Sequence, residues 1–105
     1  MKNVMKLLLC VFAVAMVFST WAFADEGADI FKGKCAACHG ADGKGTTGMG
    51  KALKLRDLSS ADVQKQSDAD LVNIITNGKE KMPKYDGKLT KDQINDVVKY
   101  LRTLK

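Results

Sequence analysis

Two cysteines and the only histidine of the chain stand within five consecutive residues. Residues 34–40 read KCAACHG, so that two alanines separate Cys35 from Cys38 and His39 follows directly. On a helix, positions i, i+3 and i+4 share one face, and two thiols and an imidazole can therefore reach a single object across one turn. The small intervening alanines let a flat group lie close to the backbone.

This pentad, Cys35–His39, is typical of covalent haem attachment. The thiols can bond to the two vinyl groups of a haem while the imidazole ligates the iron, and C-x-x-C-H is the known signature of c-type haem. Structural zinc prefers four ligands, and a thiol–disulfide oxidoreductase places C-x-x-C after a strand. The sequence shows neither a second Cys/His pair nor a convincing strand. Two inert buried thiols would not account for the adjacent histidine, so haem is favoured.

Residues 1–24 have the layout of a secretory signal peptide. Lys2 and Lys6 precede an apolar run over residues 7–18, and Ala-Phe-Ala at 22–24 fits a cleavage site. The alternative is an uncleaved membrane anchor, but the run is shorter than the roughly 20 apolar residues that a membrane span needs. The sequence therefore predicts cleavage after Ala24 and export to the periplasm, with no stable membrane insertion afterwards.

Residues 25–105 are expected to form a single small domain. The chain has 105 residues and a formal net charge of +5 with both signs spread along it, and no arginine-rich cluster suggests nucleic acid. After the leader, the only aromatic residues are Phe31, Tyr85 and Tyr100. A domain this small with so few large apolar residues often needs a staple, which a bound cofactor would provide. Cys10, inside the apolar run of the leader, is interpreted as a passive apolar residue.

Helical periodicity predicts an all-α fold with about four helices wrapped around one haem. In the first helix the residues of one face recur at steps of three and four: Ala28, Phe31, Cys35 and Cys38. Five glycines between residues 40 and 50 predict a loop that extends to about residue 55. A short helix follows, capped by Ser59 or Ser60 and reaching Gln66.

The two helices of the second half have clearer end signals. One begins at Ser67 or Asp68 and ends at Gly78, where a second loop starts. Thr90 and Gln93 fit a capping box for the last helix. Its apolar face repeats with helical period at Ile94, Val97, Val98, Leu101 and Leu104.

The sixth position of a haem iron would fall to a methionine, because the chain has no second histidine. Met49 lies in the glycine-rich loop, and Met82 precedes the only proline, Pro83, in the later loop. Methionine is more often a core residue than a ligand, but lysines and a glutamate surround Met82. The proline restricts the backbone there, and His/Met is a standard haem ligand pair. Met82 is therefore favoured over Met49.

Two long stretches resemble class I cytochrome c, of the small bacterial and photosynthetic kind. GADIFKGKCAACHGADGKG, residues 27–45, resembles the first helix and haem-binding stretch of that family. ITNGKEKMPKYDGKLTKDQINDVVKYLRTL, residues 75–104, resembles its methionine loop and last helix. The resemblance implies that the first and last helices cross beside the haem, with Gly27 and Phe31 against Val97 and Tyr100.

The chain departs from this family at one point. Many members carry a proline in the loop after C-x-x-C-H, whose region supplies a carbonyl to the second ring nitrogen of the histidine. Here the loop around Met49 and Gly50 has no proline. A backbone carbonyl can still orient His39, as such partners commonly do, but the sequence does not indicate which one.

These features together predict an electron carrier rather than an enzyme. With His39 and Met82 on the iron, no position is open for a substrate, so we expect a soluble, monomeric monohaem carrier. Arg56 or Lys54 could face a haem propionate, or both could simply be solvated. Four lysines near Met82 could steer acidic redox partners or be scattered solvated charges: Lys79, Lys81, Lys84 and Lys88.

Two other functions fit the same residues. If Met82 does not ligate the iron, an open sixth position would suit a gas sensor or a weak peroxidase. The chain could also be a small electron-donating subunit of a larger oxidoreductase, which the sequence does not distinguish from a free carrier.

Overall fold

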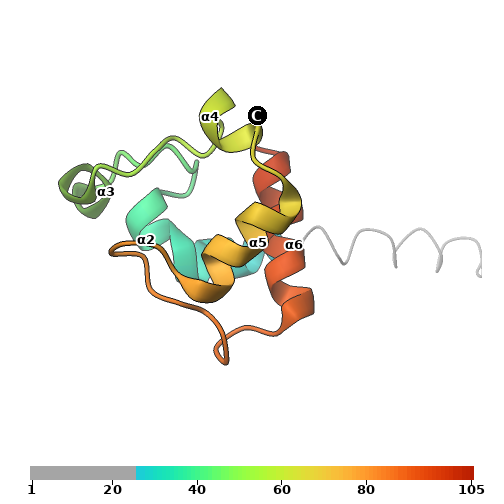
Figure 1. Ribbon diagram of the computed structural model, residues 1–105. Coiled ribbons are helices and arrows are strands. Elements are labelled where there is room, and N and C mark those ends of the chain that lie inside the picture. The colour runs from blue at the N-terminus through green and yellow to red at the C-terminus, as the bar shows by residue number, and fades with distance from the viewer. Residues whose placement is uncertain (1–25) are drawn as a thin grey trace, which may run out of the picture.

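The computed structural model describes residues 26–105, and its regular elements are helices throughout this range. They run in the order η1 (Phe31–Cys35), α2 (Ala36–His39), α3 (Gly48–Leu53), α4 (Ala61–Gln64), α5 (Asp68–Asn77) and α6 (Lys91–Arg102) (Figure 1). The described residues form no strand, and the all-α prediction is confirmed. None of their helices is long and apolar enough to cross a membrane. The predicted leader, its cleavage site and Cys10 lie outside the described residues.

The first helical stretch is not a uniform α-helix. Residues 26–30 are α-helical, and η1 is a π-helical turn in which the N–H of Ala36 donates to the carbonyl of Phe31, five residues earlier. Such wide turns interrupt α-helices mostly as single turns and are frequent at functional sites. The prediction of one regular α-helical face was therefore incomplete, because the turn comes immediately before the pentad.

The first and last helices cross in close contact, as the resemblance implied. A Cβ atom on Gly27 would overlap the carbonyl oxygen of Asp96 and would lie 3.3 Å from Cβ of Tyr100. The rings of Phe31 and Tyr100 meet one turn away, with centroids 5.3 Å apart. Phe31 and Val97 are each 1% exposed, which makes this crossing the most deeply buried part of the core.

The ends of α5 and α6 follow the predicted signals. Thr90 and Gln93 form a complete capping box, with Gln93 N–H donating to Thr90 Oγ1 at 3.1 Å and Thr90 N–H donating to Gln93 Oε1 at 2.9 Å. The hydroxyl of Ser67 accepts the N–H of Asp70, and Gly78 ends α5 with a positive φ of 76°. These caps fix the ends of α5 and α6, and the two helices pack against each other.

One element was predicted wrongly. The glycine-rich segment contains the helix α3, which lies at the edge of the molecule beyond α2 (Figure 1). Thr47 provides its N-cap by accepting the N–H of Gly50 at 2.9 Å. Glycine has a low intrinsic preference for helices, but a cap and a close tertiary contact outweigh that preference here.

Arg102 joins the end of α6 to the connection between α4 and α5. Its guanidinium lies 2.8 Å from a carboxylate oxygen of Asp68 and donates to the carbonyls of Gln66 at 2.6 Å and Gln64 at 2.9 Å. A planar guanidinium can make several such bonds at once, which a lysine could not do in this place. This network fixes the end of α6 against the connection between α4 and α5.

Gly27→Ala should destabilise the protein through the helix crossing. The added methyl group must push the backbone of α6 away, and we expect the free energy of unfolding to fall by about 1–3 kcal/mol. Gly33→Ala is the matched control, because a Cβ atom there would have no neighbour within 4 Å. Denaturant unfolding followed by circular dichroism measures both variants, and equal losses would contradict the role given to Gly27.

Candidate functional site

A cavity of about 610 Å³ lies between the first helical stretch, α5, α6 and the loops around residues 52–58 and 79–85. Its volume falls in the usual range for cofactor sites, about 300–1,000 Å³. Much of its wall is apolar and is shared with the core, including Phe31, Leu58, Val63, Leu71, Ile75, Val97 and Leu101. The cavity therefore takes the place that a larger core would otherwise fill.

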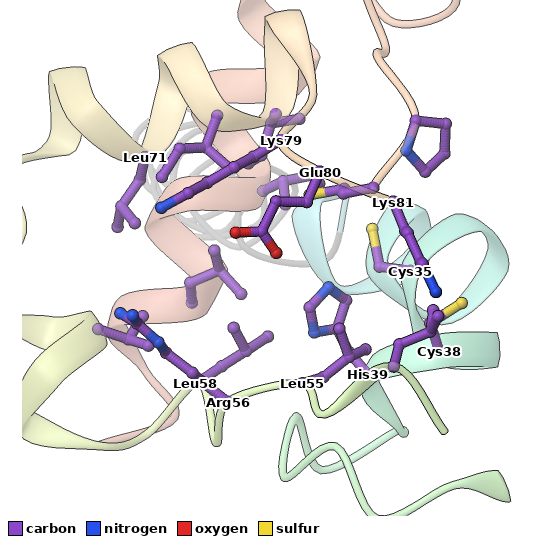
Figure 2. A pocket seen from close by; sticks show the side chains of 18 of the residues that line it. Cys35, Cys38, His39, Leu55, Arg56, Leu58, Leu71, Lys79, Glu80 and Lys81 are labelled. Atoms are coloured by element: carbon purple, nitrogen blue, oxygen red, sulfur yellow. The ribbon is translucent and has the colours of Figure 1, made fainter. Parts of the chain in front are cut away.

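The pentad lines this cavity from the side of η1 and α2. Cys35, Cys38 and His39 all border it, and both thiols are free (Figure 2). Within residues 26–105, no group of three or more Cys, His, Asp or Glu side chains is placed to hold a metal ion. The arrangement is thus that of two free thiols beside one imidazole, with fewer candidate ligands than the four that structural zinc usually takes.

Burial changes the protonation of the pentad. Desolvation raises the pKa of the Cys35 thiol to about 11, although the charge of Lys34 opposes this shift. Reactive disulfide-exchange cysteines have lowered pKa values, so a raised value argues against that chemistry. Burial also lowers the pKa of His39, which favours the neutral imidazole that a metal requires.

The ring of His39 lacks the backbone carbonyl acceptor that the sequence analysis expected. Nδ1 is buried and makes no hydrogen bond within the described residues. The expected backbone carbonyl acceptor is therefore not in place among these residues.

Thr47 connects α3 to the end of the pentad. Its Oγ1 donates to the carbonyl of Cys38 at 2.6 Å and accepts the N–H of Gly50 at 2.9 Å. A Cβ atom on Gly50 would lie only 2.6 Å from the same carbonyl oxygen, so glycine is needed for this close approach. The N–H of Gly45 donates to the carbonyl of His39 at 2.7 Å. The spacing of residues in the sequence had not indicated the contact between Thr47 and Cys38.

Met82 borders the cavity from the loop after α5. A tight turn holds it, in which Met82 N–H donates to the carbonyl of Lys79 at 2.9 Å and Lys79 N–H donates to that of Met82 at 3.3 Å. Glu80 in this turn has a φ of 55°, which few residues other than glycine adopt. Met49, by contrast, lies on α3 with 54% of its surface exposed and does not line the cavity.

Basic side chains border the end of the cavity away from the cysteines. Arg56 and Lys79 point to that end, whereas Cys35 and Cys38 lie at the opposite side of the same view (Figure 2). Lys54 also borders the cavity, and its own φ of 56° marks the left-handed end of α3. A ligand tethered at the cysteines would therefore meet positive charge at its far edge.

Comparisons with known proteins agree with this site. The family model described as "Cytochrome C oxidase, cbb3-type, subunit III" matches residues 22–101. The chain is 37% identical to cytochrome c6 of a Nostoc species, over 96% of this chain and 92% of that protein. It is 34% identical to cytochrome c6 of Porphyra purpurea, over 96% and 93%. The solved "KustC0563 c-type cytochrome" matches with a TM-score of 0.70 and 31% identity, over 75% of this chain and 96% of that one.

The fold and the comparisons define a small all-α c-type cytochrome. The chain belongs to the cytochrome c family and is similar to the cytochromes c6. It is accordingly an electron-transfer protein with one covalently bound haem c and not an enzyme. The cavity fits that group, since it offers free thiols, a half-buried imidazole and an apolar wall.

Thr47→Val should loosen the contact between α3 and the pentad. The change keeps the branched shape but leaves the Cys38 carbonyl without its donor and α3 without its cap, so we expect a loss of about 1–2 kcal/mol of stability. Thr46→Val is the matched control, because Thr46 is exposed. Thr47→Ser should restore most of the loss, and a Ser variant as weak as the Val variant would rule out the hydrogen-bonding explanation.

Proposed function

We propose that the protein is a periplasmic carrier that moves one electron through a haem tethered by Cys35 and Cys38 and ligated by His39 and Met82. The observation that supports it most directly is that all four side chains border one cavity, although Met82 is remote from the others in sequence. With both axial positions taken by protein, the iron has no site for a substrate, and the ligand set stays the same in both oxidation states. A thioether ligand favours ferrous iron and raises the potential.

The basic end of the cavity suits the propionates of such a haem. The vinyl groups and the propionates lie at opposite edges of the porphyrin, so a haem tethered at the cysteines directs its carboxylates away from them. Arg56 and Lys79 border that far end. Charge-assisted hydrogen bonds from these two residues would fix the orientation of the ring and offset the cost of partly burying the carboxylates.

The proposed location and the proposed free-carrier state are supported by the sequence of residues 1–24 and by the similarity to cytochromes c6. Residues 1–24 carry the features of an export signal cleaved after Ala24, and the chain spans more than nine tenths of the cytochromes c6 compared above. This similarity supports a carrier of the cytochrome c6 kind, and we propose that it works as a monomer. The family model named for an oxidase subunit supports the second arrangement, in which the protein donates electrons within a larger complex. Gel filtration of native extract separates the two arrangements by size.

Exposed lysines near the cavity suit acidic redox partners. Lys34, Lys79 and Lys81 border the cavity, and Lys84 and Lys88 follow in the same loop as Met82, all of them exposed. Glu80 borders the same cavity, but the lysines outnumber it, and a net positive charge around a site of electron transfer accelerates association with acidic partners.

Met82→Ala should open the iron to external ligands. We expect the ferric protein to lose the weak red charge-transfer band of thioether ligation and the ferrous protein to bind carbon monoxide rapidly. The potential should fall, since axial ligands set haem potentials over a range of about 0.8 V. Absorption spectra and potentiometric titration measure these changes.

Met49→Ala is the matched control for this experiment. Its side chain is exposed on α3, so the band, the potential and the resistance to carbon monoxide should stay as in the wild type. If wild-type protein itself binds carbon monoxide rapidly at neutral pH, the gas-sensor or peroxidase function replaces the carrier. If Met49→Ala instead loses the band, the ligand has been assigned to the wrong methionine.

Lys81→Glu should slow electron transfer to an acidic partner protein. The expected reduction is severalfold at low ionic strength and should shrink as salt is added, because exposed charges are screened beyond a Debye length. Lys99→Glu, an exposed lysine on α6 that does not border the cavity, is the control with the same change in net charge. Stopped-flow measurements give the rate of electron transfer for each variant over a series of salt concentrations. Rates that do not depend on salt would argue against electrostatic steering.

A further inference from the structure

Tyr85 connects the loop that carries Met82 to the helical stretch that carries the pentad. Its hydroxyl donates to the carbonyl of Lys34 at 3.0 Å, across 51 positions of sequence. Lys34 belongs to η1 and directly precedes Cys35, while Tyr85 follows Met82 by three positions. Within residues 26–105 this is the only hydrogen bond that joins residues 79–89 to residues 26–39.

The backbone of Tyr85 anchors the same loop on its other side. Its N–H donates to the carbonyl of Ile75 in α5 at 3.1 Å, and its own carbonyl accepts the N–H groups of Lys88 at 2.9 Å and Leu89 at 3.0 Å. The ring borders the cavity and packs against the core, with the ammonium of Lys88 lying 5.8 Å from its centroid. Tyr85 is therefore fixed at both ends, and the loop that carries Met82 lies between α5 and the pentad helix.

The acceptor lies at an unusual point of the first helix. Lys34 is within the π-helical turn, where the α-helical hydrogen-bond pattern is interrupted. A carbonyl there can accept from outside the helix without breaking a regular ladder. The hydroxyl of Tyr85 thus links the loop after α5 to the π-helical turn that precedes the pentad.

We propose that Tyr85 is a positioning residue whose hydroxyl bond to Lys34 holds the Met82 loop closed over the cavity. This inference rests on the proposed ligation of iron by Met82. Breaking the bond lets the loop move away from the pentad helix more often, and an external ligand then competes better for the position of Met82. One neutral hydrogen bond shifts such an equilibrium by about two- to tenfold.

Tyr85→Phe tests this directly in haem-loaded protein, because it removes the hydroxyl and keeps the ring. We expect the affinity of the ferric protein for imidazole to rise about two- to tenfold, with the red charge-transfer band retained when imidazole is absent. Tyr100→Phe is the matched control, since Tyr100 packs on Phe31 and its hydroxyl makes no hydrogen bond among the described residues. Equal imidazole affinities for Tyr85→Phe and wild type overturn the proposal, as does an equal rise in Tyr100→Phe.

Amide hydrogen exchange separates this proposal from the ligation itself. Residues 79–86 should exchange about two- to tenfold faster in Tyr85→Phe than in Tyr100→Phe, whatever ligates the iron. If wild-type protein lacks the charge-transfer band but this difference is present, the ligation by Met82 is wrong and the hold on the loop stands. If the band is present and exchange in the loop is unchanged, the role given to Tyr85 is wrong and the carrier stands.

Discussion

The close approach of the first and last helices at Gly27 determines where everything around the cavity lies. A residue without a side chain lets the backbone of α6 come into contact, and the rings of Phe31 and Tyr100 then pack one turn further along. The pentad continues from one of these helices, while α5 packs on the other and leads into the loop of Met82. A shift of this crossing would move the two sides of the cavity relative to each other.

The cofactor and the core of this protein are parts of one structure. Phe31, Leu71, Ile75 and Val97 belong to the buried core and also border the cavity. With Phe31, Tyr85 and Tyr100 as its only Phe, Tyr or Trp residues, the described part of the chain has little else with which to fill that space. The free energy of binding the haem is therefore also free energy of folding, as in other small domains that enclose a cofactor or metal.

Local signals predicted much of the fold, and contacts between distant segments account for what they missed. Thr90 with Gln93, and Ser67 with Gly78, act within a few residues, so the ends of α5 and α6 could be predicted. The spacing of the pentad likewise predicted three side chains at one cavity. The helix α3 was missed because it depends on Thr47 reaching Cys38 and on the close packing of Gly50. The bond between Tyr85 and Lys34 has no local signal at all.

The placement of the pentad on one short helical stretch has a consequence for the order of assembly. Cys35, Cys38 and His39 are neighbours in sequence, so a chain that has formed only its first helix already presents both proposed tethers and the proposed histidine ligand. Met82 lies far from the pentad in sequence, so we expect it to reach the cavity later, once α5 has packed on α6. On the proposed assignment, haem attachment can therefore precede folding, and the rest of the chain then folds around a group that it already carries.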